Sequence, residues 1–156
     1  MIKRGFTLIE LLIVISIIGI LAALATFSFT SAQKQARDTN RKSDLTQYRT
    51  ALEAFANKND GLYPSRTGRV NPSSAAFCTK LGLGTSCPDD PKKDNDSSFY
   101  YSYISDGTNG SDDATNFVLW AKIENVTTGG TNNWVVCSNG KSGKYTGTPT
   151  TGVCPI

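Results

Sequence analysis

The sequence GFTLIELLIVI, residues 5–15, follows a short basic leader and opens an apolar run. The 23 residues between Glu10 and Lys34 contain no charge. As a helix rising about 1.5 Å per residue, they would extend roughly 35 Å, which is enough to cross a bilayer. Lys3 and Arg4 are expected to stay on the cytoplasmic side, because short flanking segments rich in Lys and Arg resist translocation. The sequence therefore predicts one membrane span, with the rest of the chain outside.

Glu10 needs an explanation, because a carboxylate in an apolar helix is costly. In one interpretation the segment is a secretory signal peptide, since Ala23-Leu24-Ala25 supplies a small-x-small cleavage pattern, but an acid has no use in a peptide that is removed. In a second it is a plain membrane anchor, which needs no such acid. In a third the leader is cut after Gly5, which places the new amino group of Phe6 four residues from Glu10 on the same helical face.

The third interpretation gives Glu10 a function in assembly. In a dry bundle of helices its carboxylate would pair with the N-terminus of a neighbouring subunit, whereas a buried acid without a partner is strongly penalised. Such a pair would select one stagger between subunits.

The stretch from Gly5 to Ile15 resembles closely the class III leader and helix start of type IV pilins and type II secretion pseudopilins. The resemblance combines the basic leader, the Gly-Phe junction, the acid and the unbroken span, and it covers roughly the first third of the chain. It implies cleavage between Gly5 and Phe6 by a prepilin peptidase, N-methylation of Phe6, and a role for Glu10 in assembly. Many members have a proline where this chain has Phe27, so no proline kink is expected there.

The chain divides into segments of different composition. Residues 1–5 are the expected leader, 6–29 the membrane-spanning or filament-core half of one long helix, and 30–57 its amphipathic half. Residues 58–98 are predicted to form a variable loop, and residues 99–156 a sheet with a C-terminal disulfide loop.

The amphipathic half carries Leu45, Tyr48, Leu52 and Phe55 at spacings of three and four, which lines one face with apolar groups. This face is expected to pack against a sheet rather than to form a coiled-coil seam, because the pattern does not continue toward the N-terminus. Residues 33–44 are polar on all sides and are expected to be solvated or to touch neighbouring subunits.

Turn-forming residues dominate the loop. Asn59-Asp60-Gly61 is expected to end the long helix, and one helical turn is expected around Ser74–Leu81. Tyr63-Pro64 resembles the Tyr-Pro pair common in secretion pseudopilins.

Three strands are predicted from aromatic and β-branched residues: Phe99–Ile104, Phe117–Ile123 and Trp134–Cys137. Turns rich in Gly and Asn at 106–110 and 128–132 separate them and favour an antiparallel meander. The predicted fold class is α+β, a pilin-like long helix packed on a small antiparallel sheet of about three strands, followed by a C-terminal loop.

Four cysteines, Cys78, Cys87, Cys137 and Cys154, all follow the span. An even number outside the membrane favours disulfides, and three connectivities are possible. We favour the two local pairs, Cys78 with Cys87 and Cys137 with Cys154, because each closes a loop that contains Gly or Pro. Pilins that resemble this chain often carry such a C-terminal disulfide loop. A zinc site is less favoured, since without histidine it would need all four thiolates.

Two acidic clusters lie in the loops, one of Asp89, Asp90, Asp94 and Asp96 and another at 106–113. Closely spaced carboxylates can hold calcium, and the major secretion pseudopilins bind calcium in a loop. Solvated turns are the preferred interpretation, because Asp is a common turn former and neither cluster has EF-hand spacing. No cofactor is otherwise expected.

The composition argues against catalysis and nucleic-acid binding by the part of the chain that follows the span, which is called the head from here on. The chain has no histidine, so triads and imidazole bases are impossible. From residue 58 onward nine basic residues balance nine acidic ones, so no cationic groove is predicted.

The favoured function is therefore a filament subunit, not an enzyme. It would be held in the cytoplasmic membrane with its head outside, processed by a prepilin peptidase and N-methyltransferase, and polymerised with copies of itself and minor pilins at the cell surface. A pseudopilin in a periplasmic pseudopilus of a type II secretion machine is the alternative within the family. An anchored binding module or enzyme is the alternative of another class.

Overall fold

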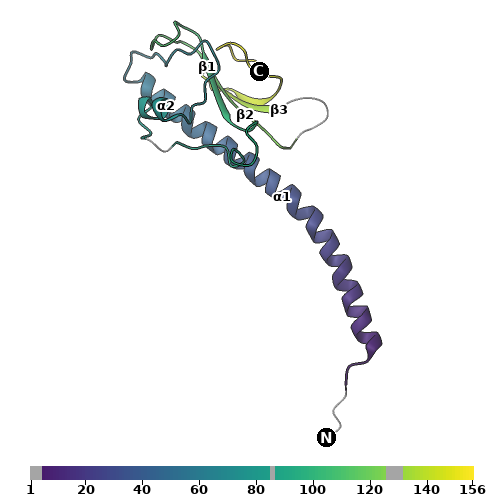
Figure 1. The fold of residues 1–156 in the computed structure, drawn as a ribbon. Coiled ribbons are helices and arrows are strands. Elements are labelled where there is room, and N and C mark those ends of the chain that lie inside the picture. Colours follow the sequence, from purple (N-terminus) through teal and green to yellow (C-terminus); the bar gives the residue numbers. More distant parts are fainter. Residues whose placement is uncertain (1–4, 85–86, 126–131) are drawn as a thin grey trace. The chain divides into compact units, whose positions relative to one another are not determined.

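A computed structural model describes residues 5–84, 87–125 and 132–156 of the chain, except for the side chains of residues 25–28 (Figure 1). The described chain forms the elements α1 (Leu8–Ala56), α2 (Ala75–Lys80), β1 (Tyr101–Ser105), β2 (Phe117–Lys122), β3 (Asn132–Cys137) and β4 (Ser142–Thr146). It divides into two compact units, Met1–Ala36 and Arg37–Ile156, which are described separately below.

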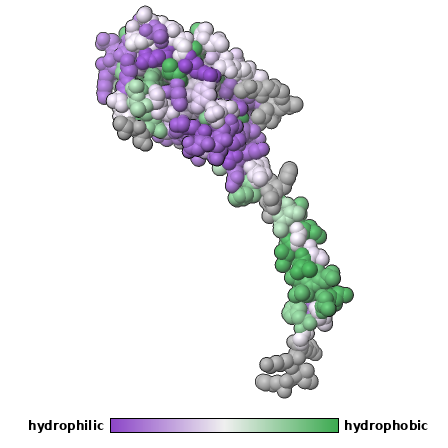
Figure 2. Space-filling view, viewed as in Figure 1, coloured by the Kyte–Doolittle hydropathy of each residue, from purple (hydrophilic) through white to green (hydrophobic). Residues whose placement is uncertain are grey.

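The first unit consists of the N-terminal part of α1, and its surface is apolar. Every large apolar side chain described there is more than two-fifths exposed, from Leu8 at 84% to Val14 at 46%. Figure 2 shows the described part of this segment as mostly green, with a few paler residues between. Because so much exposed apolar area is unfavourable in water, this part of α1 needs a bilayer or other helices around it. By length and composition α1 is able to cross a membrane, as predicted.

In the second unit, α1 buries the predicted apolar stripe. Leu45, Tyr48 and Leu52 are completely buried, and Phe55 packs against the same core. The α-helix ends at Ala56, one residue before the predicted bound at residue 57, and Gly61 closes the end by donating its N–H to the Ala56 carbonyl at 2.9 Å. Gly61 has a φ of 81°, which favours glycine at this position.

The sheet is an antiparallel meander with the order β1-β2-β3-β4. The three predicted strands are confirmed within two residues at each end, and the predicted turn around Ser74–Leu81 is confirmed as α2. The predicted turn at 128–132 lies largely outside the described residues. The fourth strand, β4, was not predicted, because only Tyr145 and Thr146 of its sequence SGKYT favour strands and it has no continuous apolar face.

The sheet has two buried faces. Tyr103, Phe117, Leu119 and Val136 pack under α1. The opposite face carries Ile104, Val118, Trp120 and Val135, and the C-terminal residues Cys154 and Ile156 pack against it. In β2, Phe117, Leu119 and Ala121 face α1 at alternate positions, and the C-terminal segment buries the side chains between them as well.

Candidate assembly site

Thr7 and Glu10 form a reciprocal cap at the start of α1. The Glu10 carboxylate accepts hydrogen bonds from the Thr7 backbone N–H at 2.9 Å and from the Thr7 hydroxyl at 2.6 Å. In return the Glu10 N–H donates to the Thr7 hydroxyl at 3.3 Å. Since α1 begins at Leu8, Thr7 is the N-cap and Glu10 the third helical residue, which is the capping-box arrangement.

This cap provides a local partner for Glu10 that the sequence reasoning missed. The signal was present as Thr7-x-x-Glu10 directly before an apolar run. Within a single chain the acid is therefore hydrogen-bonded rather than unpartnered. Any role of Glu10 in contacts between chains has to be separated by experiment from its role as a cap.

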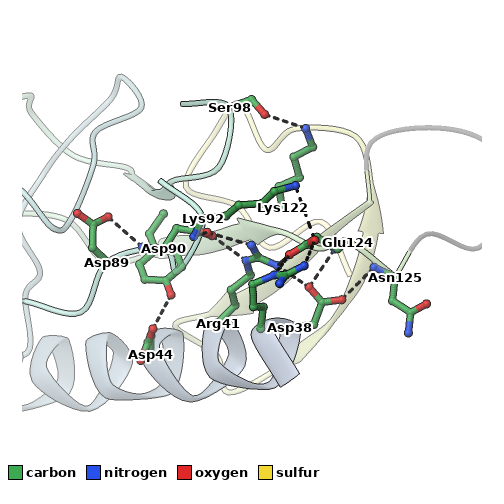
Figure 3. A network of polar contacts seen from close by, with 12 residues as sticks. Asp38, Arg41, Asp44, Asp89, Asp90, Lys92, Ser98, Lys122, Glu124 and Asn125 are labelled. Atoms are coloured by element: carbon green, nitrogen blue, oxygen red, sulfur yellow. Dashed lines mark hydrogen bonds and ion pairs between the residues drawn. The ribbon is translucent and has the colours of Figure 1, made fainter. Parts of the chain in front are cut away.

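Arg41 lies at the centre of a buried ion cluster in the second unit (Figure 3). Its side chain is fully buried, and its Nε and Nη2 atoms donate to the two oxygens of Asp90 at 2.7 and 2.9 Å. Its Nη1 atom donates to Asp38 at 2.7 Å and to Glu124 at 2.9 Å. One guanidinium thus joins α1 to the loop before β1 and to the residues after β2.

The cluster also accepts hydrogen bonds from backbone N–H groups that follow β2. The two Asp38 oxygens accept the N–H groups of Glu124 and Asn125, each at 2.9 Å. Arg37 forms a two-pronged pair with Glu124, with both hydrogen bonds at 2.7 Å. The expectation that residues 33–44 are solvated or touch neighbouring subunits was therefore wrong for Asp38 and Arg41, which the head itself buries.

Charge in the cluster is balanced. Arg37, Arg41 and Lys92 face the three carboxylates of Asp38, Asp90 and Glu124. Hydrogen bonds from Arg37 and Arg41 lower the pKa of Glu124 to about 2, although burial acts in the opposite direction. All three carboxylates are more than nine-tenths buried, so they depend on these cations for compensation.

The acidic residues proposed as calcium ligands do not converge. Asp90 is bound to Arg41, Asp89 pairs with Lys93, and the Asp96 carboxylate accepts the Ser98 N–H at 2.9 Å. Asp94 is exposed.

At the other cluster, Asp106 accepts four hydrogen bonds from Thr115 and Asn116, and Asp112 pairs with Lys80. Within the described residues no group of three or more acidic or cysteine side chains is placed to hold a metal ion.

Comparison with known proteins matches residues 1–26 to the prokaryotic N-terminal methylation motif. The chain is 46% identical to the type IV major pilin protein PilA of Myxococcus xanthus over 58 residues, and 34% identical to the type IV major alpha-pilin of Moraxella bovis over 84 residues. These matches cover 37% and 54% of this chain but only 26% and 49% of the relatives. The type II secretion system core protein G of Pseudomonas aeruginosa is 32% identical over an alignment of 118 residues, and the match covers 69% of this chain and 78% of that protein.

The chain belongs to the type IV pilin and type II pseudopilin family. Its long helix on a four-stranded antiparallel sheet is the pilin-like α+β fold that the resemblance implied. Members of this family are structural proteins and not enzymes. No solved structure matches the chain.

Two disulfide bonds staple the head of this pilin-family chain. They join Cys78 to Cys87, with Cα atoms 5.8 Å apart, and Cys137 to Cys154, with Cα atoms 5.6 Å apart. These are the two local pairs that the sequence favoured. The second bond fixes the C-terminal segment on the sheet face that points away from α1.

The Tyr-Pro pair after α1 is also a structural element of the pilin head. The Tyr63 hydroxyl donates to Glu53 at 3.0 Å, and the Pro64 carbonyl accepts the hydroxyls of Tyr103 at 2.6 Å and Ser105 at 2.9 Å. The pair therefore links the end of α1 to β1.

Proposed function

We propose that this chain is the structural subunit of a type IV pilus or a related filament. It is held in the cytoplasmic membrane by the first part of α1, cut between Gly5 and Phe6 by a prepilin peptidase, and N-methylated on Phe6. It then assembles with copies of itself and with minor pilins by helix packing. The observation that carries this proposal is the exposed apolar surface of α1, most of which lies within the residues that match the methylation motif.

The apolar surface of α1 has to be covered both before and after assembly. Before assembly the bilayer solvates the apolar side chains, and in a filament other copies of α1 replace the lipid. A subunit that leaves the membrane must keep this area covered, since apolar surface transferred to water costs about 25 cal/mol per Å². Helix packing against identical helices achieves this, and the head then faces outward at the cell surface.

Glu10 is proposed to select the stagger between subunits. The cut after Gly5 creates an amino group on Phe6, and the carboxylate of a neighbouring subunit pairs with it inside the dry helix bundle. The Thr7 cap keeps Glu10 hydrogen-bonded until that partner arrives. The assembly role thus depends on the charge of Glu10, whereas the capping role depends only on a hydrogen-bond acceptor.

Two variants separate these roles. Glu10→Gln keeps an acceptor for the cap but loses the charge, and Thr7→Ala removes the N-cap side chain but keeps the charge. We expect Glu10→Gln to reduce incorporation into sheared filaments at least tenfold at an unchanged membrane level, and Thr7→Ala to change it less than twofold. A loss of incorporation with Thr7→Ala but not with Glu10→Gln would show that Glu10 acts only as a cap, and would overturn its role in assembly. Mass spectrometry of the filament should find a methylated Phe6 as the first residue.

A pseudopilin of a type II secretion machine is the second candidate. The extended match to core protein G, over 78% of that protein, favours it. Deletion of the chain distinguishes the two: loss of surface fibres with normal protein secretion supports a pilin, and the reverse result supports a pseudopilin.

A further inference from the structure

A small polar pocket of about 80 Å³ opens on the face of the sheet that points away from α1. Its floor is formed by Ser102, Trp120, Lys122 and Asn133. In the strand register Ser102 is paired with Trp120, and Lys122 with Asn133, so these side chains share one face. Three adjacent strands thus hold the floor in place, which makes it more rigid than a loop.

The pocket is cationic although the head as a whole is balanced. Two of its lining residues, Arg69 and Lys122, are basic and none is acidic. The Arg69 guanidinium lies 4.9 Å from the ring centre of Tyr100 and forms no ion pair with any described residue. Lys122 donates to the Ser98 hydroxyl at 3.1 Å, so its described hydrogen-bond partner is neutral. The Lys122 ammonium also lies 4.6 Å from the ring centre of Phe99, and Asp96, which is not in the pocket lining, is close enough to interact with its charge. Arg69 and Lys122 thus bring two positive charges to the pocket, of which that of Arg69 has no described ion-pair partner.

Two uncharged hydrogen-bond donors also line the pocket, the Ser102 hydroxyl and the Trp120 indole N–H. The Ser102 residue is 2% exposed and Trp120 is 3% exposed, and both line the pocket. Across the described part of the chain, neither the Ser102 hydroxyl nor the Trp120 indole N–H has a hydrogen-bond partner, and neither is sealed off from the pocket. Because both donors open into the pocket and are not bonded within the described chain, a ligand that accepts from them takes the place of water there.

An acceptor and an aromatic wall complete the lining. Asn133 uses its Nδ2 atom to donate to the Gly147 carbonyl at 2.5 Å, which fixes the amide and leaves its Oδ1 atom as an acceptor. Tyr100 and Thr148 add a ring and a hydroxyl at the rim. Charged, neutral and aromatic groups therefore meet within one small volume.

We propose that this pocket binds an anionic sugar unit, with its carboxylate or phosphate between Arg69 and Lys122. The size admits one such group with part of a ring, and the donors and the acceptor match sugar hydroxyls. A planar guanidinium suits either oxyanion. A single-stranded nucleic acid fits less well, because it requires a cationic track with several stacking rings, whereas the balanced head offers one isolated pocket. This inference is independent of whether the chain forms a pilus or a pseudopilus.

The test uses the full chain in micelles of a polyoxyethylene detergent, which carries no sugar headgroup. The chain has two tryptophans, so indole ¹⁵N labelling gives two N–H signals, and Trp120→Phe identifies the one in the pocket. Titration with glucuronate or glucose 6-phosphate should shift the Trp120 signal saturably while the Trp134 signal stays fixed. Glucose and inorganic phosphate should each bind at least tenfold more weakly.

Variants that each remove one positive charge test which residues bind the anion. Arg69→Gln and Lys122→Gln should each weaken binding of both anionic sugars about tenfold, and Lys144→Gln, an exposed change in β4, should have no effect. No saturable shift, or equal losses in Lys144→Gln and the pocket variants, would overturn the proposal. Inorganic phosphate binding as tightly as glucose 6-phosphate, or tighter binding of a decathymidylate, would overturn the assignment to a sugar.

Discussion

Replacing Arg41 tests how much the buried ion cluster contributes to the stability of the head. Arg41→Met keeps most of the buried volume but removes the guanidinium, which leaves Asp38, Asp90 and Glu124 facing only Arg37 and Lys92. Asp90 has a side chain without any exposure, and Arg41 is its described ion-pair partner. Breaking a buried pair in this way costs about 3–5 kcal/mol, because the remaining charge is uncompensated.

Thermal unfolding followed by near-UV circular dichroism measures this loss, since both tryptophans lie in the second unit. For a domain of this size about 1 kcal/mol corresponds to about 4 °C, so the midpoint should fall by about 12–20 °C. Arg49→Met is the matched control on the same helix. Arg49 is more than a third exposed and lies 3.9 Å from Glu53, so its loss should cost less than about 1 kcal/mol.

A double variant tests the cause. Adding Asp90→Asn to Arg41→Met removes the uncompensated charge and should recover about 1 kcal/mol or more of the free energy of unfolding. A midpoint for Arg41→Met within about 4 °C of the wild type would refute the reasoning, because the cluster would then contribute no net stability. A double variant less stable than Arg41→Met would show that lost hydrogen bonds, and not charge, dominate.

Other predictions concern pH, the C-terminal staple and one glycine. The pKa of Glu124 is lowered from 4.5 to about 2, so its ion pairs contribute about 3 kcal/mol to the free energy of unfolding above pH 4.5. This contribution is lost as the pH falls to about 2. Urea unfolding between pH 2 and 6 should show the loss, and in Glu124→Gln this part of the pH dependence should be absent. Replacing Cys137 and Cys154 together by serine should cost about 3 kcal/mol for the 17-residue separation and should speed proteolysis of the C-terminal segment. Gly152→Ala would place a methyl group 2.4 Å from the Asp106 nitrogen and should cost about 1–3 kcal/mol in urea unfolding, whereas Gly68→Ala, with open space around it, should be neutral.

The sequence predicted those features that depend on local patterns. The apolar run and the stripe at Leu45, Tyr48 and Leu52 are periodic within a single element, so both could be recognised without the fold. The family followed from the few residues around Gly5 and Glu10, for the same reason.

Burial of Arg41 could not be predicted in this way. It depends on Asp90, 49 residues away, and on Glu124, 83 residues away, and no local pattern distinguishes such a residue from a solvated arginine. The capping role of Glu10 is different, because the Thr7-x-x-Glu10 pattern is present in the sequence. The cost of a charge in an apolar helix pointed instead to a partner in another subunit. The sugar pocket could not be foreseen either, since it needs the register of three strands.

The edges of the sheet limit how heads interact when many are crowded together. At one edge β1 is partly covered by a bridge from Val70 to Tyr103. At the other edge β4 is short, exposed at alternate positions and carries Lys144 at its centre. Blunted, charged edges of this kind oppose strand pairing between molecules. In the proposed filament, where the local concentration of heads is very high, the sheets would therefore resist joining into amyloid-like ribbons.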